Sequence, residues 1–207
     1  MGRRIYLAIF KRSLDLLISL LALIFTFPIL LAIALMLYVT QGRPIFFVQI
    51  RSGENGLPFR LLKFRTMIQS DVGHGNVTPG QTLKESRRAY KTASRGDPRI
   101  TVVGRILRAT HLDELPQLAN VILGQMTLVG PRPDVPAQME DYSAWDWRRR
   151  TQMRPGITGL AQVRTDRVNS LRARTALDIY YIRNVGFCFD IWILLRTGFK
   201  VFRASSF

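Results

Sequence analysis

Two acidic residues stand side by side in the stretch HLDELPQL, which runs from His111 to Leu118. They are Asp113 and Glu114, and a helical, apolar pattern follows them. Pro116 fits only the first turn of a helix, because a proline deeper inside would remove a hydrogen bond and clash with the preceding turn. The sequence therefore predicts Asp113 at or near an N-cap and Glu114 at the first helical position. Capping a helix is one explanation for such a pair, and chemistry is the other.

The segments around this acidic pair carry many cations, which favours the chemical explanation. Five of these cations are Lys63 and Arg65 in KFRT, Arg105 and Arg108 ahead of the pair, and Arg132 in GPRP. A carboxylate repels a phosphate unless a divalent cation lies between them, and Mg²⁺ typically binds one or two carboxylates together with phosphate oxygens of a substrate. The pattern predicts metal-assisted phosphoryl chemistry, with guanidinium groups neutralising the remaining negative charge.

The overall composition narrows the class of partner. The chain has 207 residues and a formal net charge of +16, from 30 Lys and Arg against 14 Asp and Glu. Most of these cations are arginines, which bind phosphate oxygens bidentately, so phosphates, acidic lipids and nucleic acids are candidate partners. The aromatic residues lie in apolar runs rather than on a stacking surface, which disfavours nucleic acid. Charge alone still allows a non-catalytic membrane adaptor, whereas the sequence contains neither a P-loop nor a GxGxxG pattern.

An apolar run of 26 residues, Leu14 to Val39, lies near the N-terminus. It is too long for a signal peptide, and as a straight helix it would rise about 39 Å, more than a hydrocarbon core of roughly 30 Å. Pro28 divides the run into arms that rise only about 21 Å and 17 Å. Positive residues flank both ends, so the positive-inside rule assigns no orientation. A re-entrant helix–break–helix explains these features, and a spanning helix with a proline kink is the alternative.

After this run the composition becomes that of a water-soluble domain, which predicts two parts, residues 1–42 and residues 43–207. The runs PIFFVQI and PFRLLKF enclose the turn-forming segment RSGENGL and predict a two-stranded β-hairpin. Residues 69–98 are rich in Gly, Ser, Thr and charge and are predicted to form a loop. Helical patterns dominate from Ile100 onward.

The last helical pattern covers Phe187–Phe202 and is amphipathic. Arg196 and Lys200 share one edge, while Trp192 and Phe199 are among the apolar residues on the other side. Such a helix suits a membrane surface, and a helix packed on a protein core is the alternative.

Together these segments resemble the bacterial sugar transferase family, the monotopic polyprenyl-phosphate phosphoglycosyl transferases. The resemblance runs almost from end to end and is most specific in DELPQLANVILGQMTLVGPRP. It also covers KRSLDLLISLLALIFTFPILLAIAL, GRPIFFVQIRSGENGLPFRLLKFRTM, MRPGITGLAQV and LDIYYIRNVGFCFDIWILLRTGFKVF. The fold that this family implies is α+β, with a re-entrant membrane helix, a small and mainly helical catalytic domain with a short β-hairpin, and interfacial amphipathic helices.

The resemblance also implies an activity. Family members transfer a sugar 1-phosphate from a UDP-sugar to undecaprenyl phosphate and release UMP. They use Mg²⁺ and begin bacterial surface glycan synthesis at the cytoplasmic face of the inner membrane, in contact with membrane lipid. Nucleic acid is not an expected partner. The sequence leaves open the identity of the sugar, the glycan pathway and whether the chain forms a homo-oligomer.

By the same resemblance, individual residues receive expected roles. Asp113 corresponds to the nucleophile that forms an aspartyl phosphosugar and to a metal ligand, and Glu114 is its acidic partner. The expected phosphate-binding residues are Lys63, Arg108 and Arg132. Asp178 is expected near the metal, and Pro28 at the break of the membrane helix.

Three positions depart from the family pattern. Thr26-Phe27 stands where the family often has Ser directly before the membrane proline, Gln125 replaces a carboxylate, and His111 replaces Ser or Thr. We expect His111 to make a structural hydrogen bond rather than contact the substrate.

Overall fold

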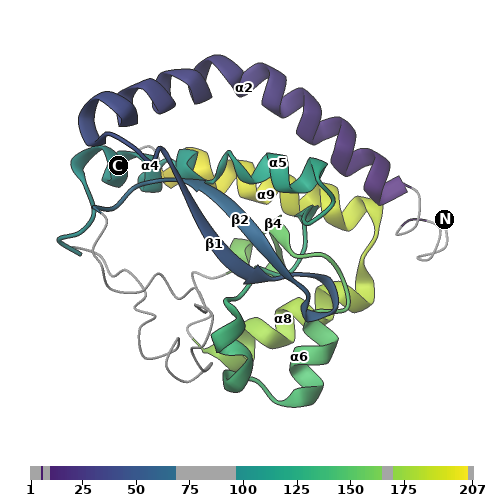
Figure 1. The fold of residues 1–207 in the computed structure, drawn as a ribbon. Helices are drawn as coiled ribbons and strands as arrows, with labels where there is room; N and C mark the ends of the chain where they lie inside the picture. The colour runs from purple at the N-terminus through teal and green to yellow at the C-terminus, as the bar shows by residue number, and fades with distance from the viewer. Residues whose placement is uncertain (1–5, 7–9, 69–96, 165–169, 205–207) are drawn as a thin grey trace.

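The computed structural model describes residue 6 and residues 10–68, 97–164 and 170–204. These residues form helices and two small sheets, which agrees with the predicted α+β class. Figure 1 shows one long helix, α2 (Lys11–Gln41), arching over the remaining elements. Below it lie the hairpin of β1 (Phe46–Ser52) and β2 (Pro58–Phe64) and the helices α5 (Gln117–Ile122) and α9 (Phe187–Ala204). The predicted loop over residues 69–98 lies almost entirely outside the described residues.

Helix α2 (Lys11–Gln41) is continuous across Pro28, so the predicted break into two separate helices is not what the structure contains. A proline removes a single backbone donor, which bends a helix without ending it when the neighbouring residues favour helix. Leu, Ile and Ala dominate this run and are helix formers. By length and composition α2 could cross a membrane, and most of its apolar surface is unburied. This surface indicates membrane association.

The N-terminal end of α2 is fixed to the domain by buried polar groups. The Lys11 ammonium lies 2.6 Å from the Asp190 carboxylate, and both side chains are buried. The hydroxyl groups of Tyr6 and Tyr181 each donate a hydrogen bond of 2.6 Å to Asp190. Asp190 therefore has three partners, as a buried carboxylate requires.

Two further side chains of the same helical end reach other elements. Asp15 accepts hydrogen bonds from the Thr127 hydroxyl and the Leu128 backbone N–H, at 2.5 Å and 3.2 Å. Arg12 donates to the carbonyl oxygens of Val121 and Ile122, which lie at the C-terminal end of α5 (Gln117–Ile122). A cation at that end satisfies carbonyl groups that have no partner within the helix.

The C-terminal end of α2 packs against the same domain. Ile33 and Leu37 are buried in a cluster with Phe64 of β2 and Leu107 of α4 (Val102–Ala109). The guanidinium group of Arg65 donates hydrogen bonds to the carbonyl oxygens of residues 41, 42 and 43, just where α2 ends. Arg65 thus closes the helix end, and its predicted role beside a phosphate is replaced by a structural one.

The predicted β-hairpin is confirmed by strands β1 (Phe46–Ser52) and β2 (Pro58–Phe64), which pair antiparallel. The turn between them includes η2 (Glu54–Gly56), where Asn55 and Gly56 adopt positive φ, a conformation that Asn and Gly tolerate best. The register places Phe47 opposite Lys63. Because side chains alternate between the two faces, Lys63 shares its face with Leu61 and Phe59, which pack on α5 through Val121.

A second, parallel sheet joins β3 (Thr127–Val129) to β4 (Gly156–Thr158). The chains approach closely beside it, since a Cβ atom on Gly156 would lie 2.1 Å from the backbone nitrogen of Gly130. This contact requires glycine and fixes the start of the GPRP segment. Shorter helices follow in the order η4 Pro136–Asp141, α6 Ala144–Arg150 and α7 Leu160–Arg164.

Two longer helices end the described chain, as the periodicity predicts: α8 (Leu171–Asn184) and α9 (Phe187–Ala204). Ser170 caps α8 by accepting a hydrogen bond from the Ala173 N–H. Ile193 of α9 and Tyr181 of α8 are buried in the main core cluster, which also contains Leu118 of α5. The helices that follow the hairpin thereby hold α5, and with it the acidic pair, in place.

Candidate active site

The acidic pair lies in the short 3-10 helix η3 (Leu112–Glu114), three residues before α5 begins. Asp113 is therefore not an N-cap of α5, which corrects the predicted helix start. The reason lies in His111, whose φ of 57° ends α4 and starts a chain of tighter turns. In these turns the N–H of Glu114 donates to the His111 carbonyl and that of Leu115 to the Leu112 carbonyl, three residues back.

Glu114 is held by two cations from distant segments. Its Oε1 atom lies 2.5 Å from the Lys63 ammonium and 3.5 Å from the Arg132 guanidinium. Burial alone would raise the pKa of Glu114, but the positive charges of Lys63 and Arg132 outweigh it and lower the pKa to about 2. Burial lowers the pKa of Lys63 in spite of its pairing with Glu114. Glu114 is consequently an ionised group with a fixed position.

Asp113 has the opposite environment, although it is the adjacent residue. Only 8% of its surface is exposed, and no described residue makes a hydrogen bond or an ion pair with its carboxylate. Burial raises the pKa of Asp113 above its ordinary value, and the charge of Lys63 opposes this shift only in part. Adjacent carboxylates with pKa values moved in opposite directions are typical of groups with different chemical roles.

Arg108 lies in the last turn of α4 and faces this site. Its Nε atom donates a hydrogen bond of 2.9 Å to the Thr66 hydroxyl, just beyond β2. Its positive charge acts to lower the pKa of Asp113. The structure thus brings Lys63, Arg108, Asp113, Glu114 and Arg132 into one neighbourhood, as the sequence led us to expect.

A shallow pocket, open to solvent, adjoins Glu114. Its charged and polar lining consists of Arg51, Lys63, Glu114, Gln117 and Arg132, and its apolar walls are Leu61, Pro133 and Ile157. Sequence reasoning missed Arg51 and Gln117. Gln117 could have been noticed because it follows Glu114 by three residues and so lies on the same side of a helical turn. No local pattern marks Arg51.

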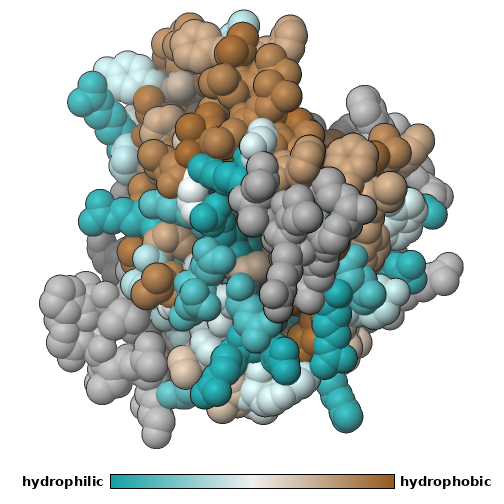
Figure 2. All heavy atoms as spheres, turned by 90° about the vertical axis from the view of Figure 1, so that its right-hand side faces the viewer, coloured by the Kyte–Doolittle hydropathy of each residue, from teal (hydrophilic) through white to brown (hydrophobic). Residues whose placement is uncertain are grey.

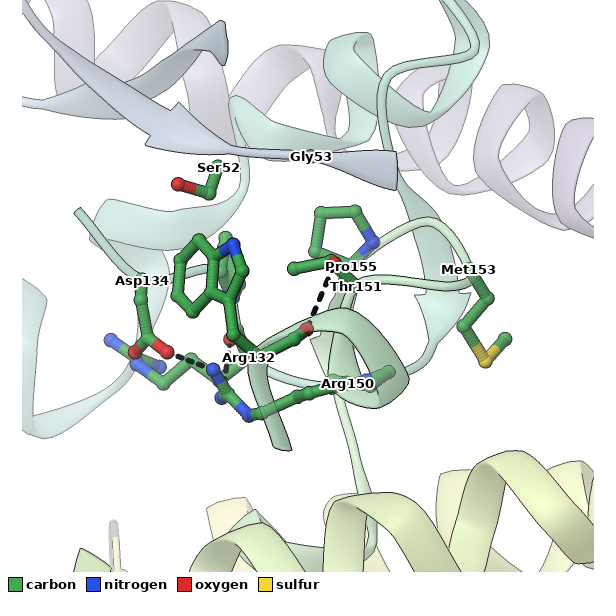
Figure 3. A pocket seen from close by; sticks show the side chains of 11 residues that line it. Ser52, Gly53, Arg132, Asp134, Arg150, Thr151, Met153 and Pro155 are labelled. Carbon is green, nitrogen blue, oxygen red and sulfur yellow. Dashed lines mark hydrogen bonds and ion pairs between the residues drawn. The ribbon is translucent and has the colours of Figure 1, made fainter. Parts of the chain in front are cut away.

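A buried arginine, Arg150, holds the segment that carries Arg132. Its Nη2 atom donates to the Arg132 carbonyl at 2.8 Å, its Nη1 atom pairs with Asp134, and its Nε atom pairs with Asp178 at 2.7 Å. Figure 3 shows Arg150 beside Asp134 and Arg132, with its ion pair to Asp134 drawn as a dashed line. The hydroxyl of Tyr142 also donates to Asp134. These contacts fix the backbone from which Arg132 reaches Glu114.

Asp178 therefore has a structural partner in Arg150 and makes no hydrogen bond with Asp113. Among the described residues no group of three or more His, Cys, Asp or Glu side chains could by itself hold a metal ion. Asp113 still fits a divalent cation, because its buried carboxylate has no partner among the described residues and Mg²⁺ needs only one or two carboxylates when phosphate oxygens complete its shell.

Of the residues that depart from the family pattern, Gln125 has a structural contact. It accepts a hydrogen bond of 2.6 Å from Asn120, so it supports the end of α5 rather than facing the acidic pair. The structural hydrogen bond expected for His111 is not found: its side chain is exposed and bonds to none of the described residues, and its role is the left-handed turn of its backbone.

Comparison with known proteins assigns the chain to a family. A model of the family described as "Bacterial sugar transferase" matches residues 6–204. The chain belongs to the bacterial sugar transferase family. A UDP-glucose:undecaprenyl-phosphate glucose-1-phosphate transferase of Caulobacter vibrioides is 43% identical over 194 residues, which cover 90% of this chain and 67% of that protein. Exopolysaccharide production protein ExoY of Sinorhizobium fredii is 40% identical over 193 residues, covering 90% of this chain and 83% of that protein.

Another family member is much longer than this chain. The UDP-glucose:undecaprenyl-phosphate glucose-1-phosphate transferase of Klebsiella pneumoniae is 38% identical over 205 residues. The match covers 96% of this chain but 41% of that protein. The chain thus spans less than half the length of this family member.

Proposed function

We propose that this protein transfers a sugar 1-phosphate from a UDP-sugar to undecaprenyl phosphate, with release of UMP, as a membrane step in the synthesis of a bacterial surface glycan. The observation that carries the proposal is the buried carboxylate of Asp113, which pairs with none of the described residues, beside a pocket lined by Lys63, Glu114 and Arg132. The Caulobacter and Klebsiella family members, which are UDP-glucose:undecaprenyl-phosphate glucose-1-phosphate transferases, support the same classes of substrate.

In the proposed reaction Asp113 acts as a nucleophile. One carboxylate oxygen forms a bond to the β-phosphorus of the UDP-sugar, and the bond from that phosphorus to the bridging oxygen breaks, so that UMP leaves with the bridging oxygen. An oxygen of undecaprenyl phosphate then bonds to the same phosphorus, and the Asp113 carboxylate leaves. The absence of a partner for Asp113 among the described residues supports this role, since no hydrogen bond has to be broken before attack.

The side chains around Asp113 bind the phosphate groups of the substrates and neutralise their negative charge. Lys63 and Arg132 bind phosphate oxygens, and Glu114 keeps both cations in position through its ion pairs. Arg108 lies close enough for its charge to act on Asp113, and it would bind a phosphate oxygen of either substrate. A bound Mg²⁺, held by Asp113 together with substrate phosphate oxygens, would neutralise charge that develops on the phosphoryl group.

For the membrane arrangement we propose that α2 enters and leaves the same face of the bilayer, the cytoplasmic face of the inner membrane. Both ends of α2 pack against one domain: Lys11 pairs with Asp190 at one end, and Leu37 packs with Leu107 at the other. A helix that crossed the membrane would place these two ends on opposite sides, so the packing favours re-entry. Pro28 would then contribute curvature to a continuous helix rather than a break.

The amphipathic helices α4 and α9 are proposed to lie at the membrane surface. Exposed apolar side chains include Ile106 on α4 and Leu195 and Phe199 on α9. Trp192 lies between the guanidinium groups of Arg164 and Arg196, at 5.7 Å and 5.4 Å from its ring centre, an arrangement suited to lipid headgroups. Figure 2 shows hydrophobic side chains gathered at the end formed by α2 and hydrophilic ones at the opposite end.

The activity is tested with purified protein, Mg²⁺, undecaprenyl phosphate and a panel of UDP-sugars. Release of UMP that depends on the acceptor lipid, together with a lipid-linked sugar product, is the expected result. If no UDP-sugar gives UMP, the proposal is wrong and a non-catalytic membrane adaptor becomes the better explanation of the basic surface.

Replacement of Arg132 is expected to slow turnover through the loss of a phosphate contact. Arg132→Ala should lower the rate of UMP release by more than about ten-fold, because a phosphate oxygen would be left without its counter-charge. Arg132→Lys should recover little, because an ammonium group cannot form the bidentate contact. A lysine variant with a near-normal rate would show that only net charge matters at this position.

Replacement of Asp178 separates a positioning role from the metal-binding role that the sequence suggests. Asp178→Asn should lower turnover roughly ten-fold, because weaker support of Arg150 lets the Arg132 segment move. The Mg²⁺ concentration that gives half-maximal activity should stay the same. A marked rise in that concentration would instead place Asp178 at the metal.

A further inference from the structure

Gln117 is a buried amide that the mechanism above does not use. It is the first residue of α5, only 3% of its surface is exposed, and it lines the pocket together with Lys63 and Glu114. None of the described residues forms a hydrogen bond with its side chain. The little surface that Gln117 exposes faces this pocket, so its amide can still donate to and accept from a molecule bound there.

A second buried amide on the same helix shows that this environment can satisfy such a group. Asn120, three residues later, donates to the Arg60 carbonyl and to Gln125, and it accepts a hydrogen bond from the Leu62 N–H. Its hydrogen-bonding groups are used to attach α5 to the edge of β2. Gln117 makes no comparable attachment, so we infer that its partner is a ligand in the pocket.

The chemistry of the amide indicates which part of a substrate it would bind. A phosphate oxygen only accepts hydrogen bonds, and Lys63 and Arg132 already provide donors for it. The same two cations make a second divalent metal ion at Gln117 unfavourable. A hydroxyl group both donates and accepts, which matches the carbonyl and the NH₂ group of a glutamine. Leu61 and Ile157 add apolar walls that suit the C–H face of a sugar ring.

We propose that Gln117 binds a hydroxyl group of the transferred sugar and helps to select that sugar. The inference rests on the proposed function, since the sugar is the group attached to the phosphorus that Asp113 attacks. Gln117 lies one helical turn beyond Glu114, which pairs with the phosphate-binding cations, so a sugar next to that phosphate would meet the amide.

The test compares the wild type with Gln117→Met, which keeps the length of the side chain and removes both hydrogen-bonding groups. UDP-glucose, UDP-galactose and their N-acetylated forms are screened first, and the donor with the fastest turnover is used. The variant should lose about ten-fold or more in kcat/KM for that donor, which is the usual effect of one hydrogen bond to a hydroxyl. Its melting temperature should be unchanged, because the Gln117 side chain makes no hydrogen bond to a described residue.

Monodeoxy analogues of the same donor identify the contact. The wild type should reject the analogue that lacks the bound hydroxyl, whereas Gln117→Met should discriminate much less at that one position. Gln125→Met is the matched control: it removes the hydrogen bond to Asn120, so it should lower the melting temperature and leave the discrimination unchanged.

The outcomes separate the two proposals. A Gln117→Met variant with unchanged kcat/KM, or with wild-type discrimination at every ring position, would overturn the role of Gln117 while the transferase activity stands. A wild-type protein that turns over none of the UDP-sugars would overturn both.

Discussion

Asp113→Asn is expected to abolish formation of a phosphosugar adduct and to lower UMP release by at least about 10³-fold. An asparagine has nearly the shape of the aspartate but no nucleophilic carboxylate. Asp113 makes no hydrogen bond to a described residue, so its replacement should not disturb the fold. The loss of its negative charge from a buried position should even favour the folded state slightly.

The measurement uses UDP-sugar and Mg²⁺ without acceptor lipid. The wild type should release at most one equivalent of UMP, and intact-protein mass spectrometry should detect one phosphosugar attached to the chain. Glu114→Gln is the comparison variant. It should impair the reaction because it weakens the ion pairs that position Lys63 and Arg132, but it leaves the nucleophile in place. If the wild type forms no adduct and labelled UMP never exchanges into UDP-sugar, the covalent route is wrong. Asp113 would then be a metal ligand in a direct transfer.

Asp190→Asn is expected to destabilise the protein by about 3–5 kcal/mol, because it leaves the buried ammonium of Lys11 without its counter-charge. An asparagine amide is uncharged, so it cannot replace the carboxylate to which Lys11, Tyr6 and Tyr181 all donate. The N-terminal end of α2 should then separate from the domain more readily than the C-terminal end. Thermal unfolding in detergent measures the loss, and accessibility of a cysteine introduced at Ser13 reports the position of the helix end.

Two variants control for this effect. Lys11→Met combined with Asp190→Asn should recover much of the stability, because no charge is then buried alone. Pro28→Ala should change stability little, since α2 is already continuous at that position. If Pro28→Ala moved Ser13 to the periplasm while Asp190→Asn did not, curvature at the proline would determine the topology rather than the anchored ends.

Local patterns in the sequence determined the elements and the chemical class. The β-hairpin, the helices of the second half and the long apolar segment follow from periodicity and turn residues, which act between near neighbours in the chain. The resemblance assigned Asp113, Glu114, Lys63, Arg108 and Arg132 to one site, and the structure brings them together. The sequence did not give the start of α5 correctly. The predicted first helical residue, Glu114, lies three residues before the observed one, Gln117, because the left-handed turn at His111 has no strong signal in the sequence.

Only the tertiary structure decided which charges are free for chemistry. The sequence placed Arg65 among the cations around the acidic pair, yet its guanidinium group donates to the backbone carbonyls where α2 ends. Arg12 and Arg150 likewise donate to backbone carbonyls of distant segments. Glu114 and Asp113 are equivalent by position, and they differ because Lys63, 51 residues away, reaches one of them. Whether a buried polar group has a partner depends on packing between segments far apart in the chain, and no local pattern encodes that.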